Sequence, residues 1–424
     1  MLTFGVETRD ITPIEPVPLA GYGYNLPNNR MSTEVAGRLA ASVLVVDDGE
    51  TRAALCGVDL LSVDLYTASA VQEIVSTHDK RPTTVLINAS HNHSGPATRA
   101  LYGAGGYNWA YVERTLVPAL SNTILAASSN TQPGAIGIAR AHAYGLNFNR
   151  TGGKSLDDRI TAIRVDRDDG SSIAGAHFAC HPTVLGPKST LISPDYPGFA
   201  RDALAEDTGV ESTLWHTGCA GDINPEVRRA PGCQRSLAEA RTVGAAIGHI
   251  AADLYQGAQL HEGKVHTHST IVDLPLDADF VLKPEIELEA FCEARHIPSG
   301  QDVSAVRKWL HEMAPIINHS SAETIPVPVT IIAIGKLTLV GFGAEIYNST
   351  GLKIEEAFPD LDVVTMMTSN GHQGYIPIED DYNGKGYAPR TSPIAFGRRP
   401  LIRNSEEILR LAAIDAVRNS ISQA

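Results

Sequence analysis

The sequence predicts an α/β fold built in layers, and three observations support this prediction. The chain has 424 residues, 43% of them hydrophobic, so it can bury a large core. Short β-rich runs bounded by turn residues dominate its first half. Segments with apolar residues at helical spacing are interleaved with these runs, most clearly at 236–254. Strands that alternate with helices indicate sheets covered by helices.

The individual elements follow from these local patterns. The expected strands are 41–46, 53–58, 84–87, 135–139, 160–165, 173–178, 327–334, 337–342 and 362–367, and the expected helices are 67–77, 111–127, 236–254, 349–358 and 405–420. The stretch 277–314 is richer in charge and reads as a helical insertion. No repeat or low-complexity linker divides the chain, which predicts a single domain over 1–424 with that insertion.

Composition narrows the class of partner. The 48 acidic residues outnumber the 34 basic ones, and the net charge of −14 opposes nucleic-acid binding. No apolar run is long enough for a membrane span or a signal peptide, so we expect a cytoplasmic protein without integral membrane association. Five scattered cysteines without CxxC spacing are expected to be packing residues. A small-molecule substrate fits best, and a homo-oligomer stays open.

Two histidine motifs end apolar strands. Residues 87–96 read Ile-Asn-Ala-Ser-His-Asn-His-Ser-Gly-Pro, so His91 and His93 point the same way if the strand continues through them. His181 stands at the tip of a second apolar run, just before a proline. Neutral imidazole is a favoured zinc ligand, although ordinary polar residues at a strand end fit the same pattern. His177 is expected to be a satisfied histidine outside any site.

Two carboxylates complete the local evidence. Asp222 lies in a loop of small residues, where it could orient a ligand histidine, act as a base or form an Asx turn. Glu345 follows a buried apolar run almost without transition, so it needs a cation or hydrogen bonds to offset its desolvation. A helix cap or a salt bridge would satisfy it as well as a metal. The block 369–375 also follows an apolar strand directly.

These segments, in this order, resemble the neutral/alkaline non-lysosomal ceramidases, and the resemblance runs to about residue 387. Ser90-His91-Asn92-His93-Ser94-Gly95-Pro96 is similar to the family's Thr-His-Thr-His-Ser-Gly-Pro block. The start at 5–12 with 21–23, the Asn-Arg-Thr at 149–151, and His181 with 191–195 resemble other family blocks. The resemblance implies a mixed-sheet, layered catalytic domain of the neutral ceramidase type.

The resemblance also implies a metal site. Carried over residue by residue, the ligands of one zinc ion per chain become His91, His181, Glu345 and Tyr375. His93 falls on the family's second histidine, which is placed to touch the substrate or the metal-bound water, and we expect it to be the general acid or base.

Two departures from the family change the expected chemistry. Asn224 stands where the family has the serine implicated in ceramide cleavage, so a serine-dependent mechanism is not expected. The chain also lacks the C-terminal immunoglobulin-like domain and the secretion signal of the long ceramidases, so ceramide itself is not the expected substrate. Asn224 or Arg150 would hold a developing oxyanion, and Asp222 would orient a ligand.

The sequence therefore predicts a zinc-dependent hydrolase that uses a metal-activated water to cleave an amide bond of a small soluble substrate. An ester or a lactone would suit the same chemistry. The polar loops 103–109 and 383–387 would line its pocket. Three alternatives stay open: a zinc-dependent lyase or isomerase acting on a polar, sugar-like substrate, a non-catalytic binding protein that retains the metal, and a metal-free structural protein.

Overall fold

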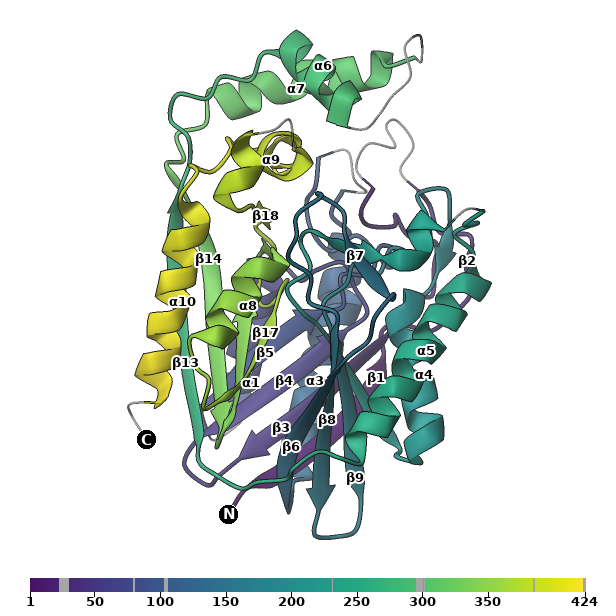
Figure 1. The fold of residues 1–424 in the computed structure, drawn as a ribbon, viewed down its shortest axis with the longest axis vertical. Helices are drawn as coiled ribbons and strands as arrows, with labels where there is room; N and C mark the ends of the chain where they lie inside the picture. The colour runs from purple at the N-terminus through teal and green to yellow at the C-terminus, as the bar shows by residue number, and fades with distance from the viewer. Residues whose placement is uncertain are drawn as a thin grey trace.

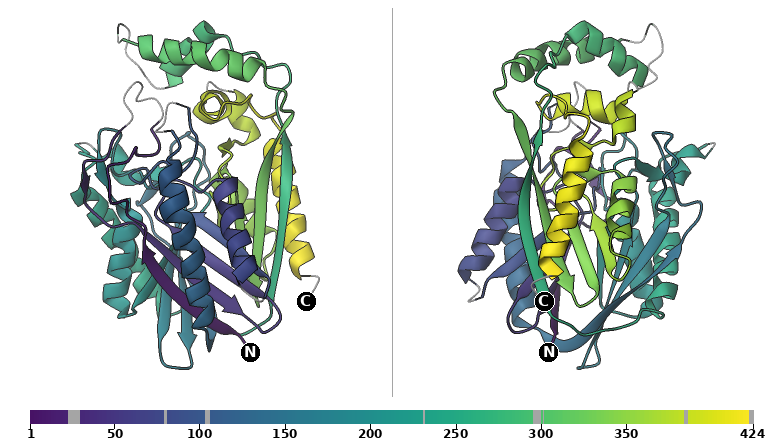
Figure 2. Two further views of the ribbon diagram at one scale, coloured as in Figure 1. Left: turned by 180° about the vertical axis from the view of Figure 1, so that it is seen from behind. Right: turned by 60° about the vertical axis from the view of Figure 1, so that its left-hand side comes forward.

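Two β-sheets packed face to face form the centre of the protein, and helices cover their outer faces (Figures 1 and 2). The computed structural model describes residues 1–22, 30–78, 81–102, 106–230, 232–294, 300, 302–383 and 386–421. The layers run helix, sheet, sheet, helix, because each sheet buries apolar side chains on both faces.

The larger sheet has eight strands in the order β11-β9-β8-β6-β1-β3-β4-β5. Their bounds are β1 Thr3–Asp10, β3 Ala40–Asp47, β4 Arg52–Val58, β5 Thr83–Ala89, β6 Gln132–His142, β8 Arg159–Arg167, β9 Ser172–Phe178 and β11 Ser212–Thr217. The pairs β4–β5 and β9–β11 are parallel and the others are antiparallel, so the sheet is mixed.

The smaller sheet has the order β13-β14-β15-β17, with β13 Val265–Pro275, β14 Thr324–Ile334, β15 Leu337–Phe342 and β17 Asp362–Met366. Alternation along the strands separates the layers. In β3, Val43 and Val45 face the outer helices, whereas Leu44 and Val46 face the other sheet. Because both faces are buried, such strands read as nearly continuous apolar runs.

Helices close both outer faces. On the large sheet, α1 (Leu65–His78) and α3 (Val117–Ser129) cover one half, and α4 (Asp195–Thr208) and α5 (Leu237–Tyr255) cover the other. The small sheet is covered by α8 (Asn348–Glu356) and α10 (Ser405–Ile421). The pair α4 and α5 packs closely because Gly244 has no side chain: a Cβ there would lie 2.6 Å from the main-chain oxygen of Tyr196.

The charged stretch contains two helices, α6 (Pro284–Ala294) and α7 (Ser304–Asn318), at the end of the molecule that is uppermost in Figure 1. They connect β13 to β14, whose ends pair at Pro275 and Thr324. The second helix continues past residue 314, where the predicted insertion ended. Below them lie the π-helical turn η4 (Tyr387–Thr391) and α9 (Ser392–Ala395).

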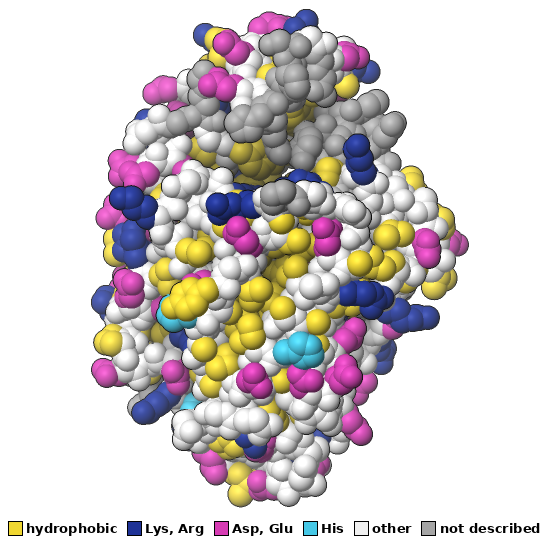
Figure 3. All heavy atoms as spheres, turned by 45° about the vertical axis from the view of Figure 1, so that its right-hand side comes forward, with side chains coloured by type: hydrophobic (Ala, Val, Ile, Leu, Met, Phe, Trp, Pro, Cys, Tyr) yellow, Lys and Arg dark blue, Asp and Glu magenta, His cyan; other side chains and the backbone are white. Residues whose placement is uncertain are grey.

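The predicted fold class is confirmed: the protein is α/β with mixed sheets. The strands expected at 41–46 and 53–58 are β3 and β4, and the helix expected at 111–127 is a run formed by α2 (Trp109–Tyr111), the π-helical η1 (Val112–Leu116) and α3. Sequence reasoning did not identify β1, β13 or α4. None of the helices in the described ranges is both long enough and apolar enough to span a membrane. On the face drawn in Figure 3, basic side chains are scattered among acidic ones rather than gathered into a stripe.

Candidate metal centre

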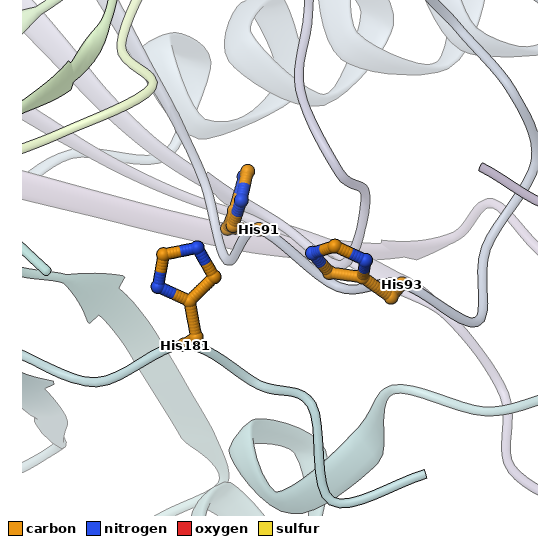
Figure 4. Close-up of side chains that lie close together, drawn as sticks. All are labelled: His91, His93 and His181. Atoms are coloured by element: carbon orange, nitrogen blue, oxygen red, sulfur yellow. The ribbon is translucent and has the colours of Figure 1, made fainter. Parts of the chain in front are cut away.

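The first histidine motif sits just beyond β5. The strand ends at Ala89, and His91 has φ of 66°, the left-handed region that few residues other than glycine adopt. The expectation that His91 and His93 share one face of a strand was therefore wrong in its reason, because the chain has turned. Their rings nevertheless lie 5.0 Å apart between centroids, and Figure 4 shows both beside His181.

Main-chain carbonyl groups orient two of these histidines. His91 Nδ1 lies 2.9 Å from the oxygen of Leu61, and His181 Nδ1 lies 2.7 Å from the oxygen of Ala220 and 3.1 Å from that of Ile223. A carbonyl only accepts hydrogen bonds, so each Nδ1 carries the proton. Each Nε2 then presents a lone pair, which is the arrangement that metal-binding histidines adopt.

Glu345 and Tyr375 are brought together by strand pairing. They open two short parallel strands, β16 (Glu345–Ile346) and β18 (Tyr375–Ile376), and lie opposite each other in the register. Glu345 Oε2 is 3.3 Å from Nε2 of both His91 and His181, and the Tyr375 hydroxyl is 3.4 Å from His181 Nε2. All four side chains are buried.

These separations fit a metal ion. Zinc holds nitrogen and oxygen ligands at 2.0–2.1 Å in a tetrahedron, which places the ligand atoms about 3.3–3.4 Å from one another. The three measured separations agree with that value. In addition, Glu345 Oε2 is buried without a hydrogen-bond partner among the described residues. The residues therefore fit the cation that the sequence analysis expected.

His372 also belongs to this centre, and sequence reasoning missed it. Its Nε2 lies 2.9 Å from Glu345 Oε1, and both side chains are buried. Groups that could hold a metal include His91, His93 and His181 as well as His91, Glu345 and His372. The short contact to the other carboxylate oxygen indicates that His372 orients Glu345. The sequence feature that could have identified His372 is its position, three residues before Tyr375 and shortly after an apolar strand.

Burial sets the protonation of the centre. Desolvation would raise the pKa of Glu345, but His91, His181 and His372 hold it well below its usual range. Desolvation lowers the pKa of His181 to about 3, with a further contribution from Arg150, and lowers that of His372 to about 4. The carboxylate is thus ionised, and the imidazoles of His181 and His372 are neutral near pH 7, the state in which histidine binds a metal.

His93 faces the cluster with its polar atoms unused. Neither ring nitrogen has a hydrogen-bond partner among the described residues, and the ring lies 6.2 Å from that of His181. Burial, followed by the neighbouring histidines, lowers the pKa of His93 well below its usual value. Gly21, at φ of 79°, passes so close that a Cβ would lie 2.2 Å from His93 Nδ1. The loop at Gly21 therefore limits the space around this ring.

Arg150 contacts the centre at Tyr375. The short strand β7 (Asn147–Asn149), which precedes it, pairs with β12 (Ile223–Pro225). One terminal nitrogen of Arg150 donates to the Tyr375 hydroxyl at 3.0 Å and to the oxygen of Gly221 at 2.6 Å. The other lies 3.5 Å from Asn224 Oδ1, at the limit of a hydrogen bond. The structure thus brings Arg150 and Asn224 together beside Tyr375.

Asp222 contacts amide groups rather than a histidine of the centre. Its carboxylate accepts hydrogen bonds from the Asn348 main-chain and side-chain nitrogens at 2.8 and 2.6 Å and from Asn149 Nδ2 at 2.7 Å. These amide donors reach both oxygens, and no described histidine contacts them. His181 is oriented by the adjacent carbonyl groups of Ala220 and Ile223. That Asp222 orients a ligand stays a prediction.

Other residues noted in the sequence lie outside the centre. His177 is buried, and its Nε2 bonds to the oxygen of Thr365 at 3.0 Å. All five cysteines are free, and burial raises the thiol pKa of Cys180 and Cys219, which suits packing residues. Positions 23, 103–105 and 384–385, named in the family start and the polar loops, fall outside the described residues.

Comparison with known proteins adds an independent line of evidence. No family model matches the chain. Neutral ceramidase A of Dictyostelium discoideum is 24% identical over 249 residues, which are 50% of this chain and 34% of that protein. Neutral ceramidase of Mycobacterium tuberculosis is 24% identical over 228 residues, 47% of this chain and 35% of that protein. The matches thus span about a third of the length of these relatives.

Solved structures match over nearly the whole chain. Neutral ceramidase from Pseudomonas aeruginosa superposes with a TM-score of 0.78 at 18% identity, covering 98% of this chain and 74% of that one. A ceramidase complexed with C2 gives a TM-score of 0.76 at 16% identity, covering 99% and 75%. At these identities the superpositions show a shared fold. By sequence this chain is similar to neutral ceramidases over about half of its length, and it shares their fold over nearly all of it.

Proposed function

We propose that the protein is a zinc-dependent hydrolase that cleaves an amide bond of a small substrate. The observation that carries the proposal is the convergence of His91 Nε2, His181 Nε2, Glu345 Oε2 and the Tyr375 hydroxyl. The separations His91–Glu345, Glu345–His181 and His181–Tyr375 are 3.3, 3.3 and 3.4 Å, the spacing expected of tetrahedral zinc ligands. Amide cleavage is the first choice because the similar proteins carry the name ceramidase. When bound, zinc polarises a carbonyl and lowers the pKa of its water toward about 7.

Two residues beside the ligands have separate roles in this proposal: His93 transfers protons and Arg150 stabilises the oxyanion. Neither ring nitrogen of His93 has a hydrogen-bond partner in the described part of the chain, and the ring lies beside the cluster. In this proposal His93 accepts a proton from the attacking water and returns it to the leaving amine. Arg150 donates toward the oxygen that becomes negative as the amide carbon turns tetrahedral. Its guanidinium is held in place by the oxygen of Gly221 and the Tyr375 hydroxyl.

Asn224 and Asp222 support this arrangement. Asn224 has no nucleophilic hydroxyl, so water is the nucleophile in this proposal, and its side-chain amide is left to position Arg150 or the substrate. Asp222 acts through its neighbours: it fixes Asn149 and Asn348, while its main-chain oxygen accepts from the main-chain nitrogen of Arg150 at 2.8 Å. Loss of Asp222 would therefore displace Arg150 rather than remove a reacting group.

Elemental analysis of the purified protein tests the ligand set. We expect about one zinc per chain in wild type, and loss of zinc in His91→Ala, His181→Ala and Glu345→Ala. His177→Ala is the matched control, since it removes a buried histidine outside the centre. Retention of zinc by all three ligand variants, or a protein that takes up none when zinc is added, would refute the assignment.

A second experiment tests the reaction. Amides, esters and lactones are screened with the zinc-loaded protein in water enriched in oxygen-18. Incorporation of the label into the acid product supports hydrolysis. Turnover without incorporation of the label would favour a lyase or isomerase. This alternative stays open because position 224 is Asn rather than serine. If the zinc-bound protein turns over no amide, ester or lactone, the result favours a non-catalytic binding protein.

A further inference from the structure

Two arginines lie on the same aromatic ring close to the metal centre. Arg99 follows the loop that carries His91 and His93, and its guanidinium carbon is 5.4 Å from the centroid of the Phe396 ring. The guanidinium carbon of Arg398 is 5.9 Å from the same centroid. The two segments are docked on each other, because the main-chain nitrogen of Tyr102 donates to the oxygen of Ala395 at 2.9 Å.

Neither guanidinium has a counterion among the described residues. Arg398 is 7% exposed and donates only to main-chain oxygens, those of Gln373 and Arg399. The Nε atoms of Arg99 and Arg398 are buried without a partner, and among the described residues no carboxylate pairs with either side chain. Asp64 is close enough to raise the pKa of Arg99, against the larger lowering by burial, but makes no ion pair with it.

The guanidinium groups of Arg99 and Arg398 are two positive charges, partly removed from water and without a carboxylate partner among the described residues, and this arrangement destabilises the folded protein. An uncompensated buried charge costs several kcal/mol, and arginine does not shed its proton to avoid that cost. Each charge also disfavours the other, as the lowering of the Arg398 pKa to about 10 by burial and by Arg99 reflects. Such a pair is stabilised by an oxyanion, which guanidinium groups bind with two parallel hydrogen bonds.

The pair is linked to the metal centre through two side chains. The Phe396 ring lies 5.1 Å from the His372 ring between centroids, and His372 contacts Glu345 at 2.9 Å. We propose that Arg99 and Arg398 bind an anionic oxygen group, a carboxylate or a phosphate, on the substrate whose amide is cleaved at the metal centre. The proposal rests on the proposed hydrolase function and adds a substrate class to it: amides that carry a negative charge.

Calorimetric binding tests the proposal without turnover. The probes are ω-acetamido carboxylates, from acetamidoacetate to 6-acetamidohexanoate, the neutral primary amides of the same chain lengths, and the corresponding phosphonates. The protein is used with its metal removed by EDTA, so that the probes cannot gain affinity by ligating zinc. We expect at least one anionic length to bind tenfold or more tighter than its neutral counterpart. The stronger of the carboxylate and phosphonate series identifies the oxyanion.

Variants assign that preference to the two arginines. Arg99→Met, which breaks no described hydrogen bond, is expected to abolish the preference for the anion, and Arg398→Met to do the same. Arg164→Met is the matched control: Arg164 lies over the Tyr255 ring but pairs with Asp166, and its loss should leave the preference unchanged. If Arg398→Met fails to fold, Arg99→Met alone decides.

The two proposals fail separately. Equal binding of anionic and neutral probes by wild type, or a preference that survives Arg99→Met, overturns the anion site even if neutral amides are hydrolysed. A preference that depends on Arg99, in a protein whose zinc-loaded form hydrolyses nothing, supports the anion site and overturns the hydrolase. Hydrolysis in which anionic amides have a KM at least tenfold lower than neutral ones, lost in Arg99→Met, supports both.

Discussion

Replacement of His372 by leucine, which cannot donate a hydrogen bond, tests how the centre holds its carboxylate ligand. The hydrogen bond from His372 Nε2 to Glu345 Oε1 is 2.9 Å long, and the two side chains are 1% and 3% exposed. A hydrogen bond to a charged group contributes about 1.5–3 kcal/mol. Without it Glu345 loses its orientation, so zinc binding should weaken by about 10- to 100-fold, the range seen for residues that orient metal ligands.

Competition with a chromophoric zinc chelator measures this change. The dissociation constants are compared for wild type, His372→Leu, the ligand variant His91→Ala and the control His177→Leu, in which another buried histidine is replaced. His91→Ala should weaken binding well beyond His372→Leu, and His177→Leu should match wild type. If His372→Leu equals His91→Ala, His372 is itself a ligand. If it equals wild type, the hydrogen bond does not position Glu345, and the reasoning from its length and burial is refuted.

Three further predictions concern turnover, pH and packing. Arg150→Lys keeps a positive charge but loses the guanidinium group that bonds to both Gly221 and Tyr375. We expect kcat, measured by steady-state kinetics, to fall by about 10²- to 10³-fold, with little change in the zinc content measured by elemental analysis. An unchanged kcat would contradict the proposed role of Arg150 in stabilising the oxyanion. Burial raises the pKa of Asp195 from 3.8 to about 6 in the folded state, so the folded state binds the proton more tightly than the unfolded state. Wild type should therefore lose about 2 kcal/mol of stability relative to Asp195→Asn as pH rises from 4 to 7, measured by urea unfolding. Parallel curves for the two proteins argue against it. Gly244→Ala places a Cβ 2.6 Å from the Tyr196 oxygen and should lower the free energy of unfolding by about 1–3 kcal/mol in the same assay. In the control Gly257→Ala the Cβ would meet only the Leu254 oxygen, at 3.5 Å, and the loss should be less than about 1 kcal/mol. Equal losses of stability would show that the close approach of α4 and α5 does not require a glycine at position 244.

The sequence could predict features whose cause is local. Continuous apolar runs identified β3, β4 and β15 because these strands are buried on both faces, and helical spacing identified α5. It did not identify β13, where half-buried and exposed polar residues follow one another, or α4, which contains a proline and a glycine near its start. Local patterning is weak in such elements, and their contacts with neighbouring layers stabilise them.

The candidate ligands were suggested by motifs together with the family resemblance, but their roles depended on distant contacts. His91 and His181 were recognisable because each ends an apolar run before a turn. The hydrogen-bond partners of Asp222 could not be identified from the sequence, because Asn149 and Asn348 come from remote parts of the chain. His372 was overlooked because nothing local distinguishes it from an exposed loop histidine.

By itself the sequence determined the layered α/β class, the main strands and helices and the presence of histidines and a glutamate at the ends of buried strands, because each depends on neighbouring residues in the chain. Only the tertiary structure decided that Glu345 meets His91, His181 and His372. It also decided that Arg99 and Arg398 share one aromatic ring, with no carboxylate of the described residues paired to either. Separations of a few ångströms between remote residues are fixed by how sheets pair and pack, and no local pattern encodes them.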